Sequence, residues 1–191
     1  MALTATIYNF DIQLSDVDRN VYETLPLRVA QHPSETVEYL ATRVLAYCLE
    51  YTEGIAFGKG LAEPDEPAIT VRDLTGTLRA WIEVGSPDAD RLHRASKASP
   101  RVAVYSVKAA SRFVSQLGGS RIHRAESIEI YGIAPAVIDE LVARLDRRTA
   151  FELAVTDRHL YLTIGGDTFD GTVERHVLAS TGDQKPPTVT R

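Results

Sequence analysis

The sequence predicts an α/β (α+β) fold, a single compact domain in which helices flank a mixed sheet. Two patterns predict it: some segments alternate apolar and polar residues, as half-buried strands do, and others repeat apolar residues at helical spacing. The 191 residues, of which 44% are hydrophobic and 25% charged, suffice for one sizeable core. We therefore expect one domain over residues 1–179, followed by a disordered tail over residues 180–191.

The first elements expected along the chain are a hairpin and a long helix. Residues 4–14 and 23–30 alternate as strands do, and the turn-forming sequence SDVDRN lies between them. Apolar residues then recur at helical spacing over residues 37–48. The Pro33-Ser34 pair suits the start of this helix, and Glu35 is favourable there because the helix dipole is positive at that end.

The middle of the chain is predicted to form a meander of three strands over residues 55–57, 69–73 and 77–84. Thr75-Gly76 fits a two-residue turn between the last two strands. A helix over residues 87–98 follows, because Gly85-Ser86-Pro87 ends the strand.

The next strand, over residues 102–105, is a continuous apolar run of the kind that is covered on both faces. The remaining elements expected are a helix, a strand, a helix and a closing hairpin, over residues 107–117, 127–131, 135–145, 151–155 and 159–164. The central order of helix, three meander strands, helix and strand is that of the PD-(D/E)XK nuclease core, here with N-terminal and C-terminal hairpins added.

The net charge is −5 and the pI about 5.5. The protein therefore has no overall positive field that would attract nucleic acid. Phosphate binding would have to come from a local patch. Basic residues do gather between positions 91 and 101, namely Arg91, His93, Arg94, Lys97 and Arg101. Such a run is more often a solvated helix face than a binding site.

Cys48 is the only cysteine, which excludes disulfides and cysteine-based zinc sites. It lies on the apolar face of the first helix, so we expect a buried, inert thiol. The N-terminal residues MALTATIYNF lack the features of a signal peptide, and no stretch approaches the ~20 apolar residues that span a bilayer. We expect a cytoplasmic protein with no membrane partner.

Hydrolysis of a phosphodiester with Mg²⁺ or Mn²⁺ needs two or more carboxylates at one metal site, with a cation nearby. Glu83, near the end of a meander strand, fits the second acid of the nuclease motif. The predicted turn pairs Leu74 with Thr77 and places Glu83 opposite Ala68. Asp73 then lies roughly 16 Å along the strand from the position opposite Glu83, too far to share a metal, and is expected to cap the turn.

The acidic stretch EPDEP is better placed for the first acid. Glu66 would be a diagonal neighbour of Glu83 on the same face, and Asp65 follows Pro64 as a Pro-Asp pair. The register alone does not decide between the two. We therefore predict a metal site formed by Glu83 with Glu66 or Asp65.

The lysine of the nuclease motif is replaced by Gly85, two residues after Glu83. Arg91, Arg94 and Lys97 follow at three-residue spacing on the next helix, and any of them could point back at Glu83. Arg94 or Lys97 could stabilise a phosphate, but only a lysine could lose a proton, because arginine stays charged.

Several stretches together resemble the bacterial YaeQ family: the opening MALTATIY, then DRN, HPSET, DEP and WIEVGSPD with its basic helix. That family is regarded as a compact variation of the PD-(D/E)XK nuclease fold. The resemblance implies family-level features at Asp65, Glu66, Glu83 and the basic positions of the following helix.

Three functions are compatible with these residues. The first is a Mg²⁺- or Mn²⁺-dependent nuclease. The second is a non-catalytic member of the fold that binds nucleic acid through Arg91, Arg94 and Lys97, or a transcription or repair partner. The third is a protein-interaction module in which Glu83 is only a polar strand residue.

Overall fold

The computed structural model describes residues 4–59, 65–106 and 109–178. The strands in this part of the chain are β1 (Thr6–Asp16), β2 (Val21–Gln31), β3 (Ile55–Phe57), β4 (Ile69–Arg72), β5 (Leu78–Val84), β6 (Arg101–Ser106), β7 (Glu129–Ile133), β8 (Arg148–Thr156), β9 (His159–Ile164) and β10 (Asp167–Val177). The helices in the same residues are α1 (Val37–Leu49), α2 (Ala89–Ala98), α3 (Ala110–Leu117) and α4 (Pro135–Ala143), and a 3₁₀ turn covers Ala125–Ser127.

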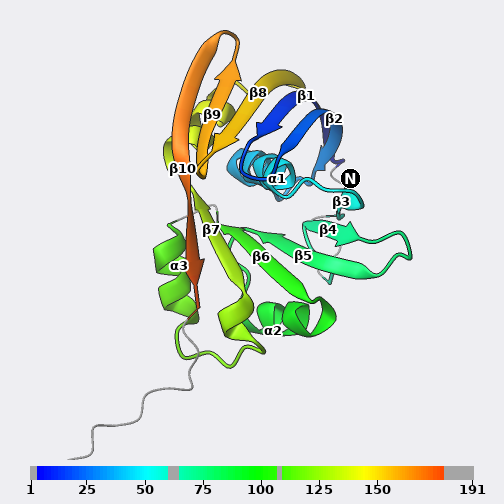
Figure 1. Cartoon of the computed structure of the whole chain (residues 1–191), viewed down its shortest axis with the longest axis vertical. Coiled ribbons are helices and arrows are strands. Elements are labelled where there is room, and N and C mark those ends of the chain that lie inside the picture. Colours follow the sequence, from blue (N-terminus) through cyan, green and yellow to red (C-terminus); the bar gives the residue numbers. More distant parts are fainter. Residues whose placement is uncertain (1–3, 60–64, 107–108, 179–191) are drawn as a thin grey trace, which may run out of the picture.

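All ten strands belong to one mixed sheet, in the order β2-β1-β8-β9-β10-β7-β6-β5-β4-β3. The pairs β1–β8, β5–β6 and β6–β7 are parallel and the others antiparallel. The sheet curves round α1, with the β1 and β8 side above the helix and the β5 and β6 side below it (Figure 1). The predicted mixed α+β class, with one domain and helices flanking a mixed sheet, is confirmed. The predicted tail over residues 180–191 lies outside the described residues.

Strand β10 joins the two parts of the sheet, and its absence from the sequence prediction was an error. Residues Asp167–Thr172 pair with β9, and Val173–Val177 pair with β7. The strand escaped prediction because its first half, DTFDG, is rich in turn residues. Gly171 is required there, because a Cβ atom at this position would lie 2.6 Å from the Cβ atom of Ala134.

Helix α1 begins later than predicted. Its N-cap is Thr36, whose side chain accepts a hydrogen bond from the Tyr39 amide at 3.1 Å, and not the Pro33-Ser34 pair. Glu35 does not act as an exposed charge at the start of the helix. It is buried and forms an ion pair with Arg43 at 3.1 Å, inside the fold.

The β4–β5 turn is longer than the two residues predicted, and the predicted pair Leu74–Thr77 does not form, but the register predicted further along the two strands is correct. The Asp73 amide donates to the Thr77 carbonyl at 3.0 Å, which encloses a three-residue loop over residues 74–76. An irregularity between Val71 and Arg72 compensates for the extra residue, so Ile69 pairs with Ile82. Continuing this register by one position places Ala68 level with Glu83, as predicted.

Alternating side chains of β5 and β6 divide the core into two layers. On the inner face, Ile82 and Ala103 pack into a core that contains α1. On the outer face, Val102 and Val104 pack against Leu92 of α2. The prediction that β6 is covered on both faces is confirmed, and the two faces carry different polar sites.

Candidate functional site

Glu83 lies near the end of β5 on the outer face of the sheet and is only 3% exposed. Its Oε1 atom accepts hydrogen bonds from Trp81 Nε1 at 2.6 Å and from Arg91 Nε at 2.7 Å, and its Oε2 atom accepts from Arg91 Nη2 at 3.2 Å. Desolvation of the carboxylate is thus offset by one full positive charge and three donors. Both carboxylate oxygens are engaged.

Arg91 is held in the first turn of α2, which starts where Asp88 accepts a hydrogen bond from the Arg91 amide at 2.7 Å. The same guanidinium donates from Nη2 to the Glu66 carbonyl oxygen at 2.7 Å. Arg91 therefore ties α2, β5 and the chain before β4 together. Of the three cations predicted to point back at Glu83, this is the one that contacts it.

Asp65 and Glu66 are both exposed, and Glu66 accepts the hydrogen bond from Arg91 through its main-chain carbonyl. Pro64, the first residue of the predicted Pro-Asp pair, lies outside the described residues. In residues 4–59, 65–106 and 109–178, no group of three or more His, Cys, Asp or Glu side chains is arranged so that it could hold a metal ion. As arranged, these residues do not fit Mg²⁺ or Mn²⁺, which require several convergent oxygen ligands. The metal site of Glu83, Glu66 and Asp65 stays a prediction.

Gly85 occupies the position of the motif lysine for a conformational reason. Its φ angle is +98°, in the region that residues with a side chain rarely adopt, and its amide donates to the Tyr105 carbonyl at 2.9 Å. A Cβ atom there would contact the ring of Tyr39 at 3.5 Å. A lysine at this position would require a different end to β5, so the backbone itself disfavours the motif.

Arg94 and Lys97 lie on the exposed side of α2, and their side chains form no hydrogen bond or ion pair with the residues that the structure describes. A loop with the sequence RIHR, residues 121–124, docks beside them. The Arg124 guanidinium donates to the carbonyl of Ser99 at 3.1 Å, and the His123 amide donates to Nδ1 of His93 at 3.2 Å. We call this region the α2 basic surface, defined by Arg94, Lys97 and residues 121–124.

The sequence did not indicate that residues 121–124 join this surface, because they lie in an irregular segment far from α2 along the chain. Arg101 is also placed differently from the basic run in which it was counted. Strand β6 turns it to the inner face, where Nη1 and Nη2 bind the Glu50 carboxylate at 2.6 and 3.0 Å. Its Nη2 also donates to Glu129 at 2.6 Å.

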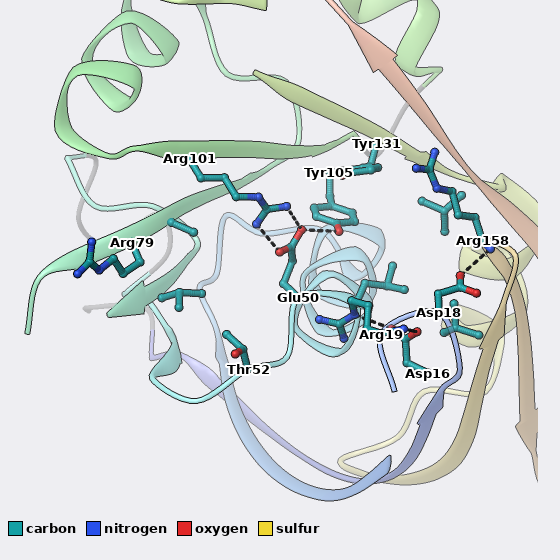
Figure 2. Close-up of a pocket in the computed structure, with 15 residues that line it drawn as sticks. Asp16, Asp18, Arg19, Glu50, Thr52, Arg79, Arg101, Tyr105, Tyr131 and Arg158 are labelled. Carbon is teal, nitrogen blue, oxygen red and sulfur yellow. Dashed lines mark hydrogen bonds and ion pairs between the residues drawn. The ribbon is translucent and has the colours of Figure 1, made fainter. Parts of the chain in front are cut away.

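The Glu50–Arg101 pair borders a cavity of about 590 Å³, here called the central cavity (Figure 2). Its lining comes from the end of α1, the β1–β2 and β8–β9 turns, and the inner faces of β4 to β7 and β10. The lining residues are Asp16, Asp18, Arg19, Leu49, Glu50, Thr52, Val71, Arg79, Ala80, Arg101, Tyr105, Tyr131, Val155, Arg158 and Val173. Of these residues, the sequence pointed only to Arg101, as part of a basic run, and it did not predict a cavity.

Burial and charge shift the pKa values of Arg101 and Tyr105, the two residues that bond Glu50. Burial alone would lower the pKa of Arg101, but hydrogen bonds and ion pairs with Glu50 and Glu129 outweigh it and raise that pKa. Burial, together with the Glu50 charge, raises the pKa of Tyr105 well above its ordinary value. Tyr105 therefore keeps its proton and donates to Glu50 at 2.8 Å.

Cys48 is completely buried in α1, and burial raises the pKa of its thiol to about 12. The thiol is therefore protonated at neutral pH, which confirms the buried thiol predicted. Within the described ranges, none of the helices has the length and apolar character needed to cross a membrane.

Comparison with known proteins finds relatives that match most of the chain. It is 29% identical over 164 residues to the uncharacterised protein YaeQ of Escherichia coli (strain K12), which covers 85% of this chain and 91% of the relative. The same figures hold for YaeQ of Salmonella typhi.

Two crystal structures match the fold. YaeQ from Xanthomonas axonopodis pv. citri superposes with a TM-score of 0.82 at 29% identity, covering 92% of this chain and 100% of that one. YaeQ from Pseudomonas syringae gives a TM-score of 0.78 at 29% identity, with coverage of 90% and 95%. The family model described as YaeQ protein matches residues 1–173. The chain therefore belongs to the YaeQ family.

Proposed function

We propose that this protein is a non-catalytic module that binds nucleic acid through the α2 basic surface. The observation that carries the proposal is the orientation of Arg94 and Lys97. Both face solvent on α2, and the RIHR loop is docked against the same helix. Cations that are not engaged within the protein are available to phosphates, and such contacts supply most of the affinity for a nucleic-acid backbone.

The state of Glu83 favours binding over catalysis. Its carboxylate is nearly inaccessible and bonded to Arg91 and Trp81, so metal chemistry would first have to break three hydrogen bonds. In this proposal Glu83 has a positioning role. It fixes Arg91, and thereby the first turn of α2, at the edge of the sheet.

The test is direct binding of labelled single-stranded and double-stranded DNA and RNA in the presence of EDTA, over a range of salt concentrations. The double variant Arg94→Glu/Lys97→Glu should weaken binding by about tenfold or more and reduce the salt slope by about two, one for each lost phosphate contact. The matched control is Arg28→Glu, on the exposed side of the edge strand β2, which should leave binding unchanged. Equal loss in both variants, or no binding by the wild type, would refute the proposal.

A second candidate, a Mg²⁺- or Mn²⁺-dependent nuclease, is favoured by one observation. Arg91 bonds both the Glu83 carboxylate and the main-chain carbonyl of Glu66, so Glu83 lies close to the acidic segment that is predicted to supply the first acid. Incubation of the same nucleic acids with either metal tests it. Cleavage that Glu83→Ala abolishes would establish the nuclease and overturn the non-catalytic proposal, whereas cleavage that survives this change would come from a contaminant.

A further inference from the structure

We propose that the central cavity binds a small molecule that combines a flat aromatic ring with a negatively charged group. The cavity volume of about 590 Å³ suits such a ligand, because small-molecule sites occupy roughly 300–1,000 Å³. The inference is independent of the proposed nucleic-acid binding. The cavity lies on the inner face of the sheet, whereas α2 covers the outer face.

The ring component follows from two tyrosines in the cavity wall. Tyr105 and Tyr131 stack with their ring centroids 5.0 Å apart and 24° between their planes. Their hydroxyl groups are anchored, Tyr105 to Glu50 at 2.8 Å and Tyr131 to Glu129 at 3.1 Å. A ligand ring would therefore meet aromatic groups that are already ordered, beside the apolar side chain of Val173.

The charged component follows from a comparison of the four arginines in the lining. Arg19 is bound to Asp16, Arg79 to Asp73, and Arg101 to Glu50 and Glu129. The Arg158 side chain makes no hydrogen bond or ion pair within the described part of the chain, and it lies exposed at the cavity (Figure 2).

The backbone that presents Arg158 is fixed by the neighbouring β1–β2 turn. The Asp18 carboxylate accepts hydrogen bonds from the amides of Asp157 at 2.7 Å and Arg158 at 2.8 Å. Both residues have left-handed backbone conformations, with φ angles of 52° and 58°. Such a conformation is costly for residues with a side chain, so Asp18 offsets a strain that keeps an unengaged arginine at the cavity.

The first experiment measures binding of phenyl phosphate, adenosine monophosphate, phenol and inorganic phosphate to the full chain by calorimetry. The two aromatic phosphates should bind about tenfold more tightly than phenol or inorganic phosphate, because only they satisfy both components. Tighter binding of adenosine monophosphate than of phenyl phosphate would identify the ligand class as a nucleotide, and the reverse order a simple aromatic anion. Failure of both aromatic phosphates to bind saturably at millimolar concentration would overturn the proposal.

The second experiment locates the site. Arg158→Ala should weaken binding of the aromatic phosphates by about tenfold, since it removes a charge-assisted hydrogen bond. Thr52→Trp, at an exposed lining position, should also weaken binding by narrowing the cavity. Arg28→Ala is the matched control and should have no effect. Loss of binding in Arg94→Ala but not in Arg158→Ala would place the ligand on the α2 basic surface and refute the inference.

Discussion

Two buried glutamate–arginine pairs lie on opposite faces of neighbouring strands, and they differ in what surrounds them. Glu83 and Arg91 form a one-to-one pair in which the arginine side chain is 22% exposed. On the inner face, Arg101 serves two carboxylates, Glu50 and Glu129, and its side chain is 37% exposed beside the central cavity. In the outer pair, Glu83 and Arg91 neutralise each other, and the pair joins α2 to the sheet. The inner network leaves polar groups ordered around an open space, which is what a ligand site requires.

The largest effect is expected from removal of Arg101. Arg101→Met leaves Glu50 and Glu129 close together without their shared cation, and Glu50 is 8% exposed. We expect a loss of about 3 kcal/mol in the free energy of unfolding, measured by urea denaturation. Arg101→Lys, which retains the charge but not the bidentate geometry, should recover part of the loss. A loss below about 1 kcal/mol would mean that water reaches Glu50 and that the inner network is not preorganised.

Removal of Arg91 should cost less. Arg91→Met leaves the hydrogen bond from the Trp81 indole to Glu83 in place, so the carboxylate is still partly compensated. We expect about 2 kcal/mol in the same measurement. If Arg91→Met proves more destabilising than Arg101→Met, the closer burial of the outer pair outweighs the two carboxylates that Arg101 neutralises, and the ranking of the two pairs is reversed.

A smaller effect is expected from Tyr105→Phe, which removes one hydrogen bond to Glu50 and keeps the stacked ring. About 1 kcal/mol should be lost from the free energy of unfolding, while Arg101 continues to neutralise Glu50. An effect as large as that of Arg101→Met would show that the tyrosine, and not the arginine, carries the inner network.

The same contrast explains what sequence could and could not predict. The meander register, α2 and the pairing of Glu83 with a cation of the following helix depend on residues close in the chain; Glu83 and Arg91 are 8 positions apart. The family resemblance, which was carried by short motifs, is confirmed by the family match over residues 1–173. Local patterns were sufficient for these features.

The central cavity depends on contacts that no local pattern encodes. Glu50 and Arg101 are 51 positions apart, and Asp18 and Arg158 are 140 apart. The missing element was β10, and without it the two parts of the sheet could not be joined round α1. A glutamate at the end of one helix and an arginine at the start of a strand look like ordinary surface charges until the sheet has curved.

The last prediction concerns Asp73, whose pKa is lowered by hydrogen bonds and not by burial. This carboxylate lies at the surface of the β4–β5 turn, where it accepts hydrogen bonds from the hydroxyl group of Thr75, the amide of Thr77 and the side chain of Arg79. These bonds, that of Thr75 above all, lower its pKa from 3.8 to about 2. Because the pKa is lower in the folded state, the stabilisation is fully present above about pH 4 and is lost as the pH falls towards 2.

Asp73→Asn should therefore flatten the dependence of unfolding free energy on pH within that window, with little change in its slope above it. Unfolding of both proteins by urea at closely spaced pH values measures this, and an unchanged slope below pH 4 would mean that the turn is not ordered by Asp73.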